Sequence, residues 1–262
     1  MKKYNHNGYI AAGRLQPTNA YIKAVAEKIL ADFCPEALLT PQAIDVDSLI
    51  EDYFGFEIVY ETLTHNDSIM GMTIFEDTMV VLYDSTAKDT RPQTIPANSV
   101  LIDESITEGK SKVRYQFTVA HEAGHIVFDN PQVHADRARS QHMMEAAEEF
   151  DPRAYAKVKP RIEAEDKLRI EQICDRFASY IILPEKTVRM AAKEILVKNG
   201  YPPSIIHAHT KVQQDFCVDV LAAGIAKIFE TSVEAVMYKL KEYKIVKSIE
   251  FYEKRKAKYG NN

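Results

Sequence analysis

The sequence predicts an α+β fold: a small antiparallel or mixed sheet packed on helices, followed by a helical C-terminal extension. Three observations support this prediction. Residues 22–33 and 114–128 carry apolar side chains at helical spacing, short β-branched and aromatic runs occupy residues 56–102, and helical spacing returns between residues 160 and 246. Because 46% of the 262 residues are apolar, the chain can bury a full core.

The first predicted helix follows a leader, residues 1–18, that has no periodicity. Apolar residues spaced three and four apart give this helix one buried face: Ile22, Val25, Ala26, Ile29, Leu30 and Phe33. A shorter helix over residues 47–54 is expected to end at Gly55, because glycine readily adopts the left-handed conformation that closes a helix.

Four short strands are expected next, over residues 56–60, 69–75, 79–83 and 99–102. Each is a run of β-branched or aromatic residues bounded by turn-forming or proline-containing segments. The last of them directly precedes the next helix. It could therefore pair with the backbone of an extended substrate, although core packing explains its apolar residues equally well.

Two longer helices follow, over residues 114–128 and between Pro160 and Pro184. The second has a clear apolar stripe: Ile170, Ile173, Cys174, Phe177, Ala178 and Ile181. The polar segment 131–160 between them is expected to be an insertion. We therefore expect one domain over residues 19–190. A helical extension over residues 191–262 should include a helix over residues 212–228 and another, capped by Ser232, that reaches residue 243.

Charge and cysteine content restrict the classes of partner. A formal net charge of -5 argues against a nucleic-acid-binding surface, and the one basic cluster, residues 254–258, is typical of a solvated chain end. No signal peptide or membrane-length apolar run is present, so we expect a cytoplasmic protein without membrane contact. Three scattered cysteines without CxxC spacing indicate reduced thiols.

The segment His121-Glu122-Ala123-Gly124-His125 is an H-E-x-x-H motif within the predicted helix 114–128. Two histidines four residues apart project from one helix face, at a spacing that suits two ligands of a tetrahedral zinc ion. Glu122 would then lie beside the open coordination position as general base for peptide hydrolysis. The alternative is coincidence, since the pattern arises by chance in roughly one or two of a hundred chains of this length.

A catalytic zinc ion normally has three protein ligands, so two histidines leave the site one ligand short. Glu171 lies next to the apolar stripe of the helix between Pro160 and Pro184, where a carboxylate needs a partner. Asp175, one turn further on, is well placed to accept the free ring N–H of a ligating histidine. The alternative for Glu171 is the ordinary polar edge of an amphipathic helix.

Segments 117–125, 171–178 and 182–184 together resemble the ImmA/IrrE family of zinc metallopeptidases, whose layout residues 20–185 follow. The resemblance implies a zincin-like fold, with His121, His125 and Glu171 as zinc ligands and Glu122 as catalytic carboxylate. Residues 229–240 look like a helix of the same family, with a lysine at its arginine position. The sequence departs from the family pattern in having Asp175 for asparagine, Cys174 for alanine and a longer insertion.

The resemblance also implies a function. Members of the family are often linked to mobile elements or stress responses and cleave a helix-turn-helix repressor, so a DNA-binding repressor is the expected substrate and partner. A second hypothesis is a zinc-stabilised anti-repressor that binds its partner through the C-terminal helices without hydrolysis. A third is direct DNA binding by residues 229–243, which the net acidity disfavours.

Several weaker candidates complete the set. An oxyanion donor could come from the predicted insertion or from a tyrosine hydroxyl, and the candidates are His134, His142, Tyr115 and Tyr180. Each is more simply explained as a surface or core residue. His207 and His209 could form a second metal pair, but the sequence near them offers no cysteine or acidic ligand to complete it.

Overall fold

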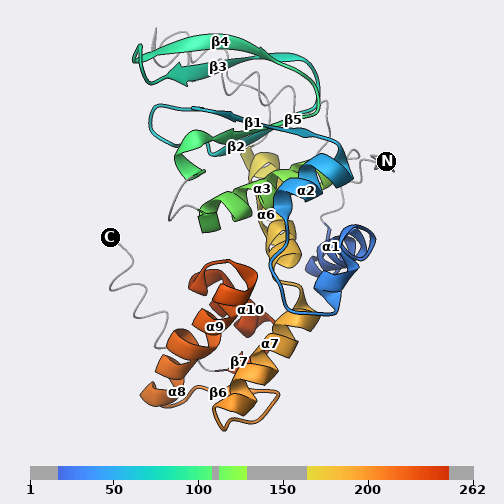
Figure 1. Ribbon diagram of the computed structural model, residues 1–262, viewed down its shortest axis with the longest axis vertical. Coiled ribbons are helices and arrows are strands. Elements are labelled where there is room, and N and C mark those ends of the chain that lie inside the picture. Colours follow the sequence, from blue (N-terminus) through green and yellow to red (C-terminus); the bar gives the residue numbers. More distant parts are fainter. Residues whose placement is uncertain (1–16, 108–111, 129–163, 248–262) are drawn as a thin grey trace. The chain divides into compact units, whose positions relative to one another are not determined.

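The computed structural model describes residues 17–107, 112–128 and 164–247. These residues form two compact units, the first from residues 17–23 and 45–178 and the second from residues 24–44 and 179–247. Both units combine helices with short strands, which confirms the α+β class (Figure 1). The expected boundary between a domain over residues 19–190 and an extension over residues 191–262 stays a prediction.

The two N-terminal helical segments form where the apolar spacing predicts them. Helix α1 spans Asn19–Phe33, and Ile22, Ala26 and Leu30 on its apolar stripe are fully buried. A short α2 (Val46–Ser48) continues as one turn of π-helix (Leu49–Phe54). That turn ends at Gly55, whose φ of 75° is the left-handed conformation expected there.

A three-stranded mixed sheet lies in the first unit, in the order β1-β5-β2 (Figure 1). Strand β5 (Ser99–Asp103) is central, with β1 (Glu57–Glu61) parallel to it and β2 (Gly71–Ile74) antiparallel. The expectation that residues 99–102 offer an edge to a substrate was therefore wrong, because both edges of β5 are already paired. The edges of this three-stranded sheet are β1 and β2.

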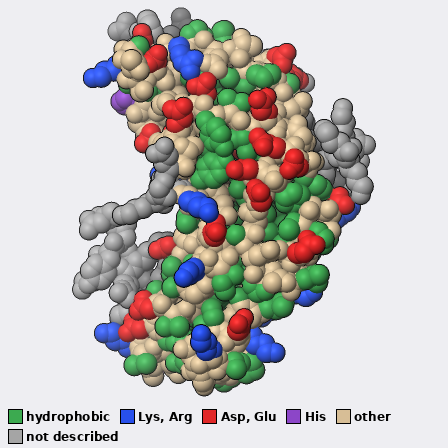
Figure 2. Space-filling view, in the orientation of Figure 1, with side chains coloured by type: hydrophobic (Ala, Val, Ile, Leu, Met, Phe, Trp, Pro, Cys, Tyr) green, Lys and Arg blue, Asp and Glu red, His purple; other side chains and the backbone are tan. Residues whose placement is uncertain are grey.

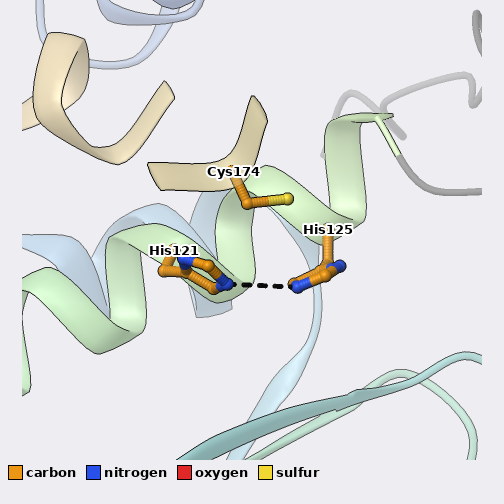
Figure 3. A group of neighbouring side chains, drawn as sticks. All are labelled: His121, His125 and Cys174. Atoms are coloured by element: carbon orange, nitrogen blue, oxygen red, sulfur yellow. Dashed lines mark hydrogen bonds between the residues drawn. The ribbon is translucent and has the colours of Figure 1, made fainter. Parts of the chain in front are cut away.

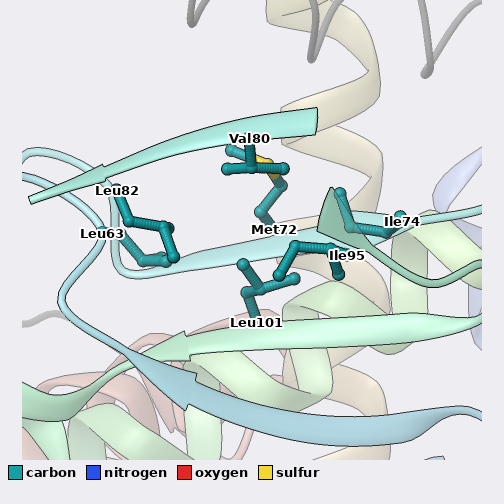
Figure 4. Packing of buried hydrophobic residues seen from close by; sticks show 7 residues of the cluster. All are labelled: Leu63, Met72, Ile74, Val80, Leu82, Ile95 and Leu101. Atoms are coloured by element: carbon teal, nitrogen blue, oxygen red, sulfur yellow. The ribbon is translucent and has the colours of Figure 1, made fainter. Parts of the chain in front are cut away.

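Strands β3 (Thr78–Asp84) and β4 (Asp89–Ile95) form a separate antiparallel hairpin. Figure 4 shows that its apolar side chains pack against those of the three-stranded sheet. This core cluster comprises Leu63, Met72, Ile74, Val80, Leu82, Ile95 and Leu101. The sequence analysis missed β4, because its residues are mostly polar and it contains Pro92, which a strand tolerates at an unpaired edge.

Helices α3 (Lys112–Phe128) and α6 (Ala164–Ile182) position the candidate site. Helix α3 packs against β2 and β5, and every residue from Glu122 to Phe128 is buried. All six residues of the apolar stripe predicted for α6 are buried as well. The predicted insertion 131–160, most of the leader 1–18 and the basic cluster in residues 254–258 lie outside the described residues.

The second unit is mainly helical. It contains the short helix η1 (Pro35–Leu38). From residue 185 on, its elements in chain order are α7 (Glu185–Lys198), β6 (Ile206–His207), α8 (Lys211–Phe216), a π-helical turn (Cys217–Ala222), α9 (Ala223–Phe229), α10 (Val233–Glu242) and β7 (Val246–Lys247). Ser232 caps α10 by accepting the N–H of Ala235 at 3.0 Å. The parallel β6–β7 pair, only two residues long, was not predicted.

A buried lysine stabilises the position of α10 in this unit. Lys239 is 1% exposed, lies 3.5 Å from the centre of the Tyr180 ring, and pairs with Glu242 at 2.9 Å. Burial of a lysine is tolerated where its charge is paired and an aromatic face covers it.

The described surface carries charges of both signs. On the face shown in Figure 2, acidic and basic side chains are interspersed with apolar ones, and the described basic residues form no continuous stripe there. No helix among the described residues has both the length and the hydropathy needed to cross a bilayer.

Candidate metal centre

Helix α3 brings the two histidines of the H-E-x-x-H motif together. His121 and His125 lie one turn apart, and their Nε2 atoms are 3.2 Å from each other. Both rings are held against the core, since His125 is 5% exposed and the side chain of His121 is 15% exposed. Two imidazole nitrogens therefore face the same point at the surface of α3.

Helix α6 adds a carboxylate at that point. Glu171 Oε2 lies 3.2 Å from His121 Nε2 and 3.8 Å from His125 Nε2. In a tetrahedral site with bonds of about 2.0–2.2 Å, ligand atoms lie about 3.3–3.6 Å apart. The three atoms predicted as metal ligands thus have nearly the separations that one bound ion requires, and the residues fit a metal.

A fourth group, not predicted as a ligand, lies close to the same point. The ligating atoms of His121, His125 and Cys174 all lie within 4.8 Å of one another, close enough to bind a metal. Figure 3 shows Cys174 reaching from α6 toward the two imidazole rings of α3. It was interpreted as a core residue because of its place on the apolar stripe, although its position three residues after Glu171 puts both on one helix face.

The remaining predicted residue of α6, Asp175, contacts the opposite side of an imidazole. Its Oδ1 accepts the Nδ1–H of His121 at 2.9 Å. A hydrogen bond there orients the ring, with Nε2 as the nitrogen that faces Glu171 and His125. The contact needed for an orienting role is therefore present.

Burial and hydrogen bonding together shift the pKa values of His121 and Glu171. Burial alone would lower the pKa of His121, but its hydrogen bonds to Asp175 and Glu171 outweigh burial and raise that pKa to about 9. Burial would raise the pKa of Glu171, but hydrogen bonds from the two histidines hold it well below its ordinary value of 4.5. A proton and a metal ion thus compete for the same lone pairs.

Glu122 lies beside the histidines but faces the sheet. It is 4% exposed, and its Oε2 accepts the hydroxyl hydrogen of Thr73 on β2 at 2.7 Å. The backbone of β2 passes so close that a Cβ atom at Gly71 would lie 2.6 Å from Glu122 Oε1. Glycine at position 71 therefore leaves room for the carboxylate.

Comparison with known proteins adds little to this geometry. No protein-family model and no curated protein matches the chain. Among solved structures, the chain is similar to a Mycobacterium tuberculosis transcriptional regulator, with 13% identity and a TM-score of 0.39. The match covers 85% of this chain and 48% of that protein, so this chain spans about half of its length. The site is therefore interpreted from its own residues.

The weaker candidates lie elsewhere. The Tyr115 hydroxyl donates to Asp47 Oδ1 at 2.7 Å, and the Tyr180 hydroxyl donates to Glu242. Both hydroxyl hydrogens are therefore already engaged and do not serve as oxyanion donors. His134 and His142 lie outside the described residues. The rings of His207 and His209 stack on each other, 5.5 Å apart. Within the described part of the chain, three or more candidate ligands gather only around His121 and His125.

The close approach of β2 to Glu122 gives a first test. We expect Gly71→Ala to lower the free energy of unfolding by about 1–3 kcal/mol, because the added methyl group would lie 2.6 Å from Glu122 Oε1 and 2.8 Å from Thr118 Cγ2. Urea titration measures this free energy. An unchanged free energy of unfolding would show that the Glu122 carboxylate moves aside at no cost.

The crossing of α3 and α6 gives a second test. A Cβ atom at Gly124 would lie 2.8 Å from Cys174 Cα and 2.9 Å from its Cβ, so the two helices approach too closely for a side chain. We expect Gly124→Ala to lower the free energy of unfolding by about 1–3 kcal/mol, despite the higher helix propensity of alanine. Urea titration measures this free energy.

Gly224 in α9 is the matched control. There an added Cβ atom would meet only the end of the flexible Ile195 side chain, at 2.9 Å. We expect Gly224→Ala to leave the free energy of unfolding unchanged or to raise it by up to about 1 kcal/mol. Equal effects of the two substitutions would contradict the tight helix crossing at Gly124.

Proposed function

We propose that the protein is a zinc-dependent endopeptidase. The observation that carries this proposal is the convergence of His121 Nε2, His125 Nε2 and Glu171 Oε2 at separations of 3.2–3.8 Å. Two imidazoles and one carboxylate form a donor set that suits zinc and leaves one coordination position open. Glu122, which follows His121 in the sequence, supplies a buried carboxylate as the proposed general base.

Each residue of the site has a separate role in the proposed hydrolysis. A zinc ion held by the three ligands would polarise a peptide carbonyl and make a water molecule more acidic. Glu122 accepts the proton of the attacking water and returns it to the leaving amine. The Thr73 hydroxyl fixes one oxygen of that carboxylate, so the other is free to receive the proton. Asp175 holds the imidazole of His121 in the ligating tautomer.

Strand β2 is the proposed binding edge for the substrate backbone. It is an edge strand of the described sheet, it packs against α3, and it carries Thr73, which contacts Glu122. An extended peptide can add to such an edge through main-chain hydrogen bonds. This would place a scissile bond beside the metal ligands. The further proposal that the substrate is a helix-turn-helix repressor rests on the ImmA/IrrE resemblance.

The test is a count of new protein N-termini in lysate of the source cell, measured by mass spectrometry. The lysate receives the zinc-loaded protein, the same protein stripped by a chelator, or the Glu122→Gln variant. We expect new termini in one or two proteins with the zinc-loaded sample alone. Identical termini in all three samples, with zinc bound where added, would rule out peptidase activity in that lysate.

A further inference from the structure

We propose that Cys174 is a fourth protein ligand of the metal held by His121, His125 and Glu171. This inference rests on the proposed metal centre and concerns its regulation. With Cys174 bound, the centre has a closed set of four protein ligands, and the position needed for hydrolytic water is filled. Water would then reach the ion only in those molecules from which the thiolate has withdrawn, so Cys174 would limit the activity of the zinc-loaded chain without abolishing it.

Proximity is the first argument. Cys174 Sγ lies within 4.8 Å of a ring nitrogen of each histidine, and the residue is fully buried. Figure 3 shows it beside the space between the two imidazoles. Glu171 and Cys174 are three residues apart on α6, so one helix face presents both groups to the pair on α3.

The distance that remains is small. Zinc bonds of about 2.3 Å to sulfur and 2.0–2.1 Å to nitrogen place the two ligand atoms about 3.6 Å apart. The candidate ligand atoms of the two histidines and Cys174 already lie within 4.8 Å of one another, and rotation about the Cα–Cβ bond of cysteine can move Sγ closer. Gly124 gives the thiol this room, because a Cβ atom there would lie 3.2 Å from Sγ.

Coordination also changes which metals the centre prefers. When the thiol binds, its proton is released to water and the sulfur ligates as thiolate. Thiolate is a soft donor, so it favours cadmium and cobalt–sulfur bonding more than a site of two imidazoles and a carboxylate does. This gives the proposal a spectroscopic signature that does not depend on peptidase activity.

The experiment loads the full chain with Co²⁺ and records its absorption. Tetrahedral Co²⁺ has visible ligand-field bands, and a cobalt–thiolate bond adds charge-transfer absorption in the near ultraviolet. The samples are the unchanged chain, Cys174→Ala, Cys174→Ser, and a Cys34→Ala, Cys217→Ala double variant in which Cys174 is the sole thiol. Serine keeps the volume of the side chain, in case alanine loosens the helix crossing.

We expect charge-transfer absorption in the unchanged chain and in the sole-thiol variant, and its loss in both Cys174 variants. Affinity for Cd²⁺ should fall at least about 10-fold in those variants. Ligand-field bands without charge transfer in the unchanged chain would overturn the thiolate ligand and leave the three-ligand centre intact. Absence of both kinds of band would remove the metal centre itself, and with it the proposed function.

Discussion

Glu122→Gln is expected to slow peptide cleavage by about 100- to 10,000-fold and to leave the metal bound. The amide has nearly the shape of the carboxylate but cannot accept the proton of the attacking water. The Thr73 hydroxyl, which now donates to Glu122 at 2.7 Å, can donate to the amide oxygen instead, so the buried side chain keeps a partner. The histidines and Glu171 are unchanged, so zinc affinity should be unaffected.

Turnover of the protein cleaved in lysate, and zinc content by mass spectrometry, are measured on one preparation. The control is Glu57→Gln, the same carboxylate-to-amide substitution at an exposed residue of β1, and it should keep full activity. The comparison also separates hydrolysis from the binding-module hypothesis. If a repressor is still released by zinc-loaded Glu122→Gln, release does not need cleavage and the protein acts as an anti-repressor.

Local spacing explains why part of the site could be predicted from the sequence. His121 and His125 belong to a single helix, so its geometry alone brings their rings together, with centroids 5.0 Å apart. Glu171 is fifty residues away in sequence. Its approach to His121 depends on how α3 and α6 pack, and the sequence indicated it only through a polar position beside an apolar stripe and through the family resemblance.

The partners of Glu122 could not be predicted, because they depend on the order of strands in the sheet. Thr73 and Gly71 face the carboxylate only because β2 lies at the edge of the sheet that packs against α3. The alternation of apolar residues in a strand predicts which of its side chains are buried, but it does not predict which strands pair with it. For the same reason the edge was assigned to residues 99–102, which are central in the observed sheet.

Glu171→Gln is expected to lower zinc affinity by more than about 100-fold, beyond the usual effect of losing a group that only orients a ligand. The carboxylate supplies the single negative charge among the three proposed ligands, and the amide oxygen that replaces it is a neutral, weaker donor. Competition with a chromophoric chelator measures the affinity. Peptide cleavage should fall with zinc occupancy and recover in part at high zinc concentration.

Asp175→Asn is the matched control, because it removes one carboxylate from the same helix face and keeps an oxygen that accepts the Nδ1–H of His121. Its zinc affinity should fall by less than about 10-fold. If Glu171→Gln binds zinc as tightly as the unchanged chain, the third ligand is another residue. Cys174, whose sulfur lies within 4.8 Å of a ring nitrogen of each histidine, would then hold that place. The double substitution of Glu171 and Cys174 should abolish zinc binding in either case, since two imidazoles alone cannot complete the site.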